Sequence, residues 1–312
     1  MAEGKRLSVL LSQVNYSALQ QEASRFRNGC RVQIPPPSGP HLKGGMNYHI
    51  AIFVDGEVDG LLARIPLPYT SFSLPTLLSK KTHTSEAATI RYLHHHGIPV
   101  PRLYSYNFSN KNAVGVPYMI MDWMQGQPYH PSHINEPQHR NFIDQLADIM
   151  IKLSTLNLTK SGALTFDQDG TIVMGPFTHP EDVDLSSGTE PCLPGPFATV
   201  KEYRLHIIRD KLCRISRGED FGCAALDAEL FYRHLITVVE AMYPEDYTGS
   251  GRFFIKHADD KGDHILVDKD GNITGIIDWE WWVLLSHTIA CAHDVVGPLP
   301  HPFTRPSVRQ LP

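Results

Sequence analysis

The sequence has few cysteines, no long apolar run and no excess of positive charge, and each absence excludes a class of protein. Five cysteines are scattered without a Cys-x-x-Cys pair, which favours free thiols over a disulfide framework or a zinc site. No run approaches the roughly 18 apolar residues of a membrane span, and the N-terminus lacks the usual form of a signal peptide. The formal net charge is -5, which gives no general attraction to nucleic acid or to an acidic membrane. We therefore expect a cytoplasmic protein without a nucleic-acid or membrane partner.

The length and apolar content are sufficient for one large domain or two lobes. The chain has 312 residues, of which 42% are hydrophobic and 20% charged, ordinary values for a globular protein. Alternation and turn residues predict strands at 47–67 (a hairpin around Asp55-Gly56), 102–108 and 117–123, after one or two helices in 1–34. Glycine and proline residues after Asp122 mark a linker. Beyond it, helical spacing predicts helices at 138–156, 199–214 and 224–242. Turn residues predict a hairpin at 166–177, and the composition of 178–195 predicts an exposed loop. The sequence thus predicts a strand-rich part followed by a helical part.

A further helix is predicted between Thr82 and Gly97. Thr82 or Thr84 would cap it, so that Glu86 would lie in the first turn, where the helix dipole favours an acid. The three histidines at 94–96 point in different directions on a helix, so we expect a solvated helix end there.

The acids and histidines between Phe253 and Trp282 are the strongest functional signal. Short apolar strands alternate with the polar loop HADDKGDH and with the turn KDGN. A cluster of acids at strand ends is unfavourable unless it binds a cation or a polar substrate. The strand ends deliver five such side chains to one region: His257, Asp259, Asp263, His264 and Asp278.

Phosphoryl transfer needs the kinds of groups that this cluster contains. One carboxylate orients the acceptor hydroxyl, another holds Mg²⁺, a further ligand fixes the metal, and a cation neutralises the phosphates. Asp259 suits the first role, Asp278 the second and the side chain at 264 the third, and His257 would brace the loop. Arg64 suits the fourth role. The sequence supports equally well the interpretation that Arg64 lies on an edge strand and points to solvent. A metal-dependent hydrolase is a weaker alternative, because the loop lacks a His-x-His spacing.

The segments HADDKGDHILVD and GIIDWE resemble the catalytic loop and metal segment of the aminoglycoside phosphotransferase-like family, and other segments follow in the family's order over about 40–282. The resemblance implies an α+β, two-lobed, protein-kinase-like fold with an N-terminal helical arm (1–39), a nucleotide-binding lobe (40–122) and a helical lobe (123–312). It implies a catalytic loop at 257–264 and a metal segment at 276–280. It also implies a small-molecule kinase that uses ATP and Mg²⁺ on an unidentified hydroxyl acceptor. The residues implied in nucleotide binding are Gly44 and Gly45 in the covering loop, Arg64 paired with Glu86, and the hinge backbone from Met121 to Trp123.

Three departures from the family pattern support a second hypothesis, a catalytically impaired pseudokinase or nucleotide-binding module. His264 replaces the usual Asn, although the K-G-D-H variant resembles a fungal-type branch, and Asp263 or a preference for Mn²⁺ would compensate. Arg64 replaces the usual Lys, and its fork has a different reach. After Asp278 the chain shows little helical period, and we hypothesise a truncated or misread C-terminus. The acceptor and the oligomeric state are not predicted.

Overall fold

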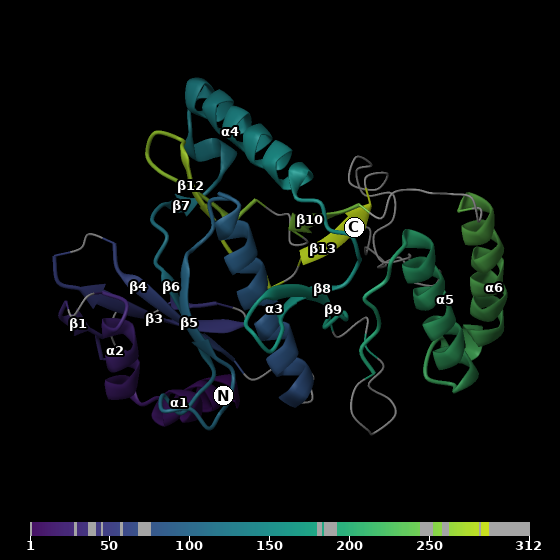
Figure 1. Ribbon diagram of the computed structural model, residues 1–312, viewed down its shortest axis with the longest axis horizontal. Helices are drawn as coiled ribbons and strands as arrows, with labels where there is room; N and C mark the ends of the chain where they lie inside the picture. Colours follow the sequence, from purple (N-terminus) through teal and green to yellow (C-terminus); the bar gives the residue numbers. More distant parts are fainter. Residues whose placement is uncertain are drawn as a thin grey trace, which may run out of the picture.

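The protein consists of an antiparallel sheet flanked by helices, followed by a mainly helical part with short hairpins (Figure 1). The computed structural model describes residues 2–27, 30–36, 42–44, 46–56, 59–67, 76–179, 183, 192–243, 252–257, 262–280 and 282–286.

The N-terminal sheet contains six strands, and every pairing in it is antiparallel. The strand order is β1-β3-β4-β6-β5, with β2 paired to β3. The strands are β1 (Val32–Gln33), β2 (Leu42–Lys43), β3 (Asn47–Val54), β4 (Leu61–Pro66), β5 (Leu103–Asn107) and β6 (Tyr118–Asp122). The strands predicted at 47–67, 102–108 and 117–123 are confirmed, whereas β1 and β2 were not predicted. Because β4 lies between β3 and β6, it is an interior strand.

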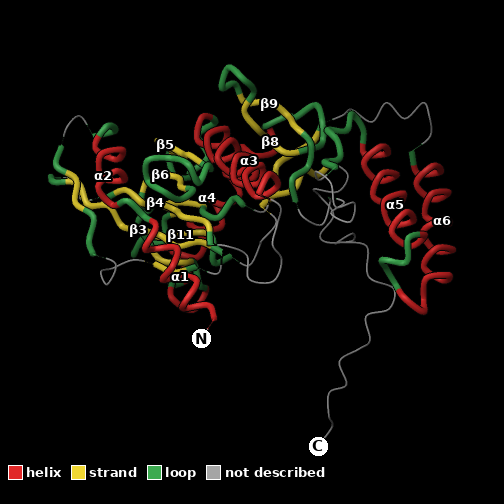
Figure 2. The backbone as a smooth tube through the Cα atoms, turned by 90° about the horizontal axis from the view of Figure 1, so that it is seen from below, coloured by secondary structure: helices red, strands yellow, loops and turns green. Residues whose placement is uncertain are grey.

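The two faces of this sheet belong to two different cores. One face, which includes Ile50 and Ile52, packs with Leu19 and Ala23 against helices α1 (Ala2–Gln13) and α2 (Tyr16–Ser24). The other face, which includes Met119, packs with helix α3 (Thr76–His95) and with residues of the C-terminal part. Figure 2 shows α1, α2 and α3 around the sheet. The sheet is therefore the layer that separates the N-terminal helices from α3.

Helix α3 begins earlier than the sequence predicted. Thr82 and Thr84 are inside the helix, and the Thr82 hydroxyl donates to the carbonyls of Leu78 and Thr178. Glu86 consequently lies near the middle of the helix, so the expectation of a first-turn acid stabilised by the dipole is wrong. The three histidines at 94–96 are exposed at the helix end, as predicted.

The C-terminal part contains the predicted helices with ends shifted by no more than two residues. They are α4 (Glu136–Thr155), α5 (Val200–Ser216) and α6 (Ala225–Met242). Asn135 and Thr199 form capping boxes with Gln138 and Glu202, which explains where α4 and α5 start. The predicted hairpin is β8 (Ala163–Phe166) with β9 (Ile172–Gly175). Among the described residues, 3₁₀ turns lie at Pro131–His133 and Gly222–Ala224.

The segments around the acid-histidine cluster form two small sheets. In one sheet β11 (Ile265–Val267) lies between β12 (Ile273–Ile276) and β7 (Gln127–Pro128). In the other, β10 (Phe253–His257) pairs with β13 (Trp282–Ser286). Strands β10, β11 and β12 were predicted, whereas β7 and β13 were not, and β12 ends two residues before Asp278. The tail beyond residue 286 lies outside the described residues, so the hypothesis about the C-terminus stays untested.

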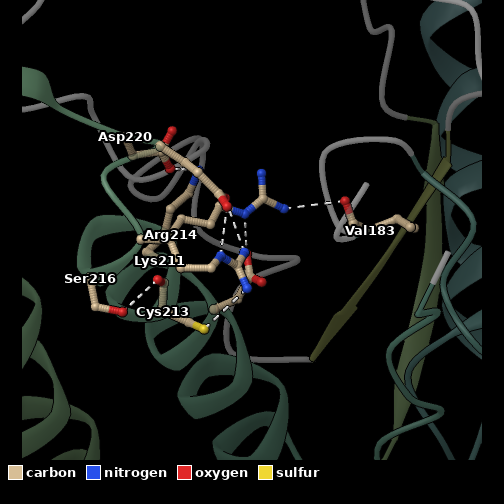
Figure 3. Close-up of polar contacts among 9 residues, drawn as sticks. Val183, Lys211, Cys213, Arg214, Ser216 and Asp220 are labelled. Atoms are coloured by element: carbon tan, nitrogen blue, oxygen red, sulfur yellow. Dashed lines mark hydrogen bonds and ion pairs between the residues drawn. The ribbon is translucent and has the colours of Figure 1, made fainter. Parts of the chain in front are cut away.

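Helices α5 and α6 form a hairpin with its own apolar core, beside the rest of the protein (Figure 1). Figure 3 shows the polar contacts along α5. Arg214 donates to Asp210 at 2.8 Å and to the carbonyl of Val183 at 3.2 Å, and Lys211 lies 3.5 Å from Asp220. These contacts hold the end of α5 to its own loop and to residue 183.

The described residues confirm the predicted α+β, two-lobed architecture, whereas the domain limits at 39 and 122 stay predictions. No helix among the described residues is long and apolar enough to cross a membrane.

Candidate functional site

Arg64 lies at the centre of the site, in an interior strand. It pairs with His49 on β3 and with Met119 on β6, and directly opposed residues of an antiparallel sheet share a face. Its side chain is only 5% exposed. The reading of Arg64 as an edge-strand arginine that points to solvent is therefore wrong.

Three carboxylates surround the Arg64 guanidinium. Glu86 of α3 forms an ion pair with Nη1. Nη2 lies 2.9 Å from Asp278 Oδ1 and 3.0 Å from Glu280 Oε2. Asn47, the first residue of β3, also donates to Glu280 Oε2, at 3.2 Å. The structure thus brings together three of the sequence-predicted site residues, Arg64, Glu86 and Asp278.

The charges in this group do not balance. Three carboxylates against one guanidinium leave a formal excess of two negative charges, and the side chains of Glu86 and Glu280 are almost fully buried. The Asp278 side chain is 50% exposed. Because buried unbalanced charge is unfavourable, the group favours a cation beside Asp278, on its exposed side.

Contacts on both sides of Asp278 fix its position. The Ile277 N–H donates to the His264 carbonyl at 2.9 Å, and His257 Nε2 donates to the Ile277 carbonyl at 3.0 Å. Trp279 is 1% exposed and donates from Nε1 to the Ile276 carbonyl. Asp278 itself has φ +67°, a left-handed conformation that is uncommon outside glycine and is found at functional sites. The chain after β12 therefore turns so that the carboxylate faces Arg64.

The two loop histidines stack on each other. Their ring centroids are 4.0 Å apart, with 10° between the planes, and both residues are buried. His257 also contacts Trp279 edge to face, with centroids 4.8 Å apart. His257 and His264 thus form one stack beside Trp279, and the bracing of the loop by His257 stays a prediction.

The predicted metal ligands do not converge within the described part of the chain. Asp263 is exposed, whereas His264 is buried. No three His, Cys, Asp or Glu side chains of the described residues form a metal-binding group. Asp259 and Gly45, which the sequence assigned to the base and the covering loop, lie outside the described residues.

The segments that the sequence predicted as covering loop and hinge lie at the two ends of the strands that carry the Arg64 face. Gly44 donates to the Asn47 carbonyl at 2.8 Å in a tight turn between β2 and β3. Met121 is buried, and the N–H groups of Asp122 and Trp123 donate to the carbonyls of Arg102 and Gly60. These two hinge N–H groups are therefore already hydrogen-bonded within the protein.

An aromatic pair lies beside the hinge. Phe53 is 44% exposed, and its ring centroid is 6.0 Å from that of Trp123. Ala51 and Leu62 face each other between this pair and Arg64. The sheet face therefore runs from a cation, over apolar side chains, to the exposed Phe53 ring and the half-buried Trp123 ring.

The sequence-based prediction missed three polar residues of the site. Glu280 follows Asp278 by two positions within the quoted GIIDWE pattern, which was the available signal. Asn47 opens a strand and gave none. His83, one helical turn before Glu86, is 4% exposed, and its Nδ1 has no hydrogen-bond partner among the described residues. Burial, together with the nearby positive charge of Arg64, lowers the pKa of His83 to about 4.

The sequence of this chain matches the model of a known protein family. The phosphotransferase enzyme family (APH) matches residues 73–284, which include Glu86, the acid-histidine loop and Asp278. The chain belongs to this family. The match extends from before α3 to β13, so this phosphotransferase-family segment contains most of the elements described above.

Three solved structures similar to this family member share 12–14% of its sequence. A candidate aminoglycoside phosphotransferase from Ralstonia eutropha is 12% identical, with a TM-score of 0.47 over 87% of this chain and 66% of that chain. A macrolide 2'-phosphotransferase type I is 14% identical, with a TM-score of 0.40 over 86% and 72%. An ethanolamine kinase from Plasmodium vivax is 14% identical, with a TM-score of 0.43 over 82% and 57%. The chain thus spans just under two thirds of the first of these proteins. No curated protein matches the sequence.

Proposed function

We propose that this protein transfers a phosphate from ATP to a hydroxyl group of a small molecule. The observation that carries the proposal is the Arg64 group. One guanidinium joins Glu86 of α3 to Asp278 at the end of the acid-histidine segment. That arrangement supports the proposal, because Arg64 would be the cation that binds phosphate and Asp278 the carboxylate that binds the metal, two parts that phosphoryl transfer requires.

In this proposal each residue of the site has a separate role. Arg64 holds the nucleotide phosphates, and Glu86 keeps its guanidinium in place. Glu280, held by Asn47, restrains the second guanidinium nitrogen. Asp259 accepts the proton of the acceptor hydroxyl. His257 positions the chain before Asp278 through the Ile277 carbonyl.

The donor set at Asp278 fits a divalent cation. Its carboxylate oxygen suits Mg²⁺, it is half exposed, and the surrounding formal charge is negative. At most one of Asp263 and His264 would join Asp278 as a ligand, because the three do not form one group among the described residues, and a nitrogen ligand would favour Mn²⁺ over Mg²⁺. When bound, the ion would supply positive charge to the phosphates.

The aromatic end of the Arg64 face suits a nucleobase. Phe53 offers a flat, exposed ring and Trp123 a half-buried one, and Leu62 offers an apolar surface next to them. A base that stacks on these rings would place its phosphates toward Arg64 on the same face. Because two hinge N–H groups are already bonded, we assign the base to these rings more than to the hinge backbone.

The Asp259→Asn variant tests the proposal. We expect ATP to bind as in the wild type and the release of ADP to fall by at least about 100-fold, the usual contribution of a general base. The adjacent Asp260→Asn variant is the matched control, with wild-type turnover expected. ADP release is measured in a coupled assay with a panel of hydroxyl acceptors. Unchanged turnover in Asp259→Asn would refute the assigned role.

A second function, nucleotide binding without turnover, is supported by a specific observation. Asp278 is already paired with Arg64, and the His264 ring is buried in a stack on His257. Thermal shift with ATP and either Mg²⁺ or Mn²⁺, followed by the turnover assay, separates the two functions. Stabilisation without ADP release under both metals would favour this second function.

A further inference from the structure

The N-terminal arm, defined here as residues 2–27, contacts the hinge from the face opposite Arg64. Successive side chains of a strand alternate between faces. Tyr118 and Ile120 of β6 pack on the side of the arm, whereas Met119 and Met121 pack on the side of α3. By the same alternation the Asp122 side chain lies on the side of the arm, and it makes its contacts there.

Both oxygens of the Asp122 carboxylate are bound. Tyr104 donates its hydroxyl to Oδ1 at 2.7 Å, and the Arg102 N–H donates to Oδ2 at 3.1 Å. Arg27, at the end of the arm, places Nη2 3.7 Å from Oδ1 and its guanidinium carbon 4.6 Å from the centre of the Tyr104 ring. The Arg27 side chain is only 15% exposed. This is a partly buried network, in which electrostatic contacts are stronger than on an open surface.

The arm is anchored to the sheet at other points. The Ser105 hydroxyl donates to Glu22 at 2.7 Å, and the Asn15 N–H donates to the Val114 carbonyl at 2.8 Å. Gly115 has φ +85°, and its backbone passes so close to the Gln13 carbonyl that a Cβ would overlap it. The arm and the hinge strand are therefore held in one geometry.

We propose that the arm positions the hinge, and thereby sets the affinity for the nucleotide, through Arg27, Tyr104 and Asp122. The inference rests on the proposed nucleotide function, because Met121 and Trp123 flank Asp122 and lie toward the nucleotide face. The three are positioning residues, since none lies on the face that carries Arg64. Loosening the Asp122 carboxylate shifts the Trp123 ring and so weakens binding of the base, without changing the groups that transfer phosphate.

The experiment compares Arg27→Met and Tyr104→Phe with Arg25→Met. Arg25 also lies at the end of α2, but its side chain is 72% exposed and pairs with Glu22 within the arm. In the full-length protein we measure ADP binding by calorimetry, KM for ATP, kcat and Tm. Loss of one charge-assisted contact predicts that Kd and KM rise by about threefold to tenfold, whereas kcat and Tm change little. Arg27→Lys, which keeps the charge, retains most of the affinity.

The outcomes separate this inference from the proposed function. If the wild type binds no nucleotide, the proposed function is wrong and the inference is wrong with it. The wild type could instead bind nucleotide while Arg27→Met and Tyr104→Phe show the same Kd as the control Arg25→Met. In that case only the inference is overturned. A fall in kcat equal to the rise in KM, or a loss of Tm that accounts for the weaker binding, also overturns it. Should Arg27→Met unfold, Tyr104→Phe alone decides, because it removes a single oxygen.

Discussion

At the scale of the residue, the fork of Arg64 connects three parts of the chain. Nη1 binds Glu86 while Nη2 binds Asp278 and Glu280. A lysine ammonium is a single point charge and does not reach both sides of this group. Arg64→Lys restores the family's usual residue, yet we expect kcat/KM to fall about tenfold or more, together with about 1–3 kcal/mol of stability, because a buried carboxylate loses its partner.

Steady-state kinetics and urea unfolding check this prediction. Arg233→Lys is the matched control, because Arg233 is 65% exposed in a surface pair with Glu229. Its stability should change by less than about 0.5 kcal/mol. Wild-type kinetics in Arg64→Lys would contradict the assigned role of the fork.

His83 makes the stability depend on acid pH. Its pKa in the folded protein is lowered to about 4, whereas in the unfolded chain it is near 6.5. As the pH falls from about 7 to 5, the unfolded chain gains a proton that the folded protein does not accept, so the free energy of unfolding falls. For this group the loss is about 2 kcal/mol at pH 5, and it approaches about 3 kcal/mol below pH 4.

Urea unfolding at pH 7 and pH 5 measures this loss. His83→Gln cannot titrate and should lose less stability than the wild type over this interval, by about 2 kcal/mol. His95→Gln, on the exposed end of the same helix, should behave as the wild type. Equal losses in the wild type and His83→Gln would show that His83 does not remain neutral in the fold.

At the scale of the element, the docking of the arm depends on one glycine. Gly115→Ala adds a Cβ that meets the Gln13 carbonyl and also strains a positive φ. Gly56 has a similar φ of +83° with nothing near its missing Cβ, so Gly56→Ala isolates the backbone strain. We expect Gly56→Ala to cost about 1 kcal/mol and Gly115→Ala clearly more, about 2–4 kcal/mol. If chemical denaturation shows equal losses of unfolding free energy in the two variants, the arm moves to accommodate the added Cβ.

The positions of individual helices and strands along the sequence were more predictable than the strands with which they pair. Alternation located β3, β4 and β6, and helical spacing located α4, α5 and α6, because each signal is local. The early start of α3 was missed because Thr82 resembles a cap, although its hydroxyl bonds back to Leu78 inside the helix. The position of β6 between β4 and β5, and the two-residue strand β7, depend on contacts between distant segments.

The site was predictable as a set of residue types but not as a network. The motif gave Asp278 and, through the family resemblance, the pair Arg64–Glu86. The contacts of Asn47 and Glu280 with each other required the fold, because the two residues are 233 positions apart.

At the scale of the whole molecule, ligands should stabilise the protein only in combination. We expect ATP with Mg²⁺ or Mn²⁺ at about 100 times Kd to add about 2.7 kcal/mol, a rise in Tm of several degrees. A chelator should remove most of this increment, and Asp278→Asn should lose the part that depends on the metal. Differential scanning fluorimetry measures both. An equal increment in Asp278→Asn would exclude Asp278 as a metal ligand.

The separation of the partners around Arg64 has a consequence for the order in which the protein assembles during synthesis. Arg64 and Glu86 leave the ribosome early, whereas Asp278 follows Arg64 by 214 residues. At about 5–20 residues per second this interval lasts roughly 10–40 seconds. During that time the N-terminal sheet has its strands and its arm, but the guanidinium has only one of its three carboxylates. The Arg64 group is therefore completed only when translation delivers residues 278–280, and a nascent chain that stops before them carries the N-terminal sheet without Asp278 and Glu280.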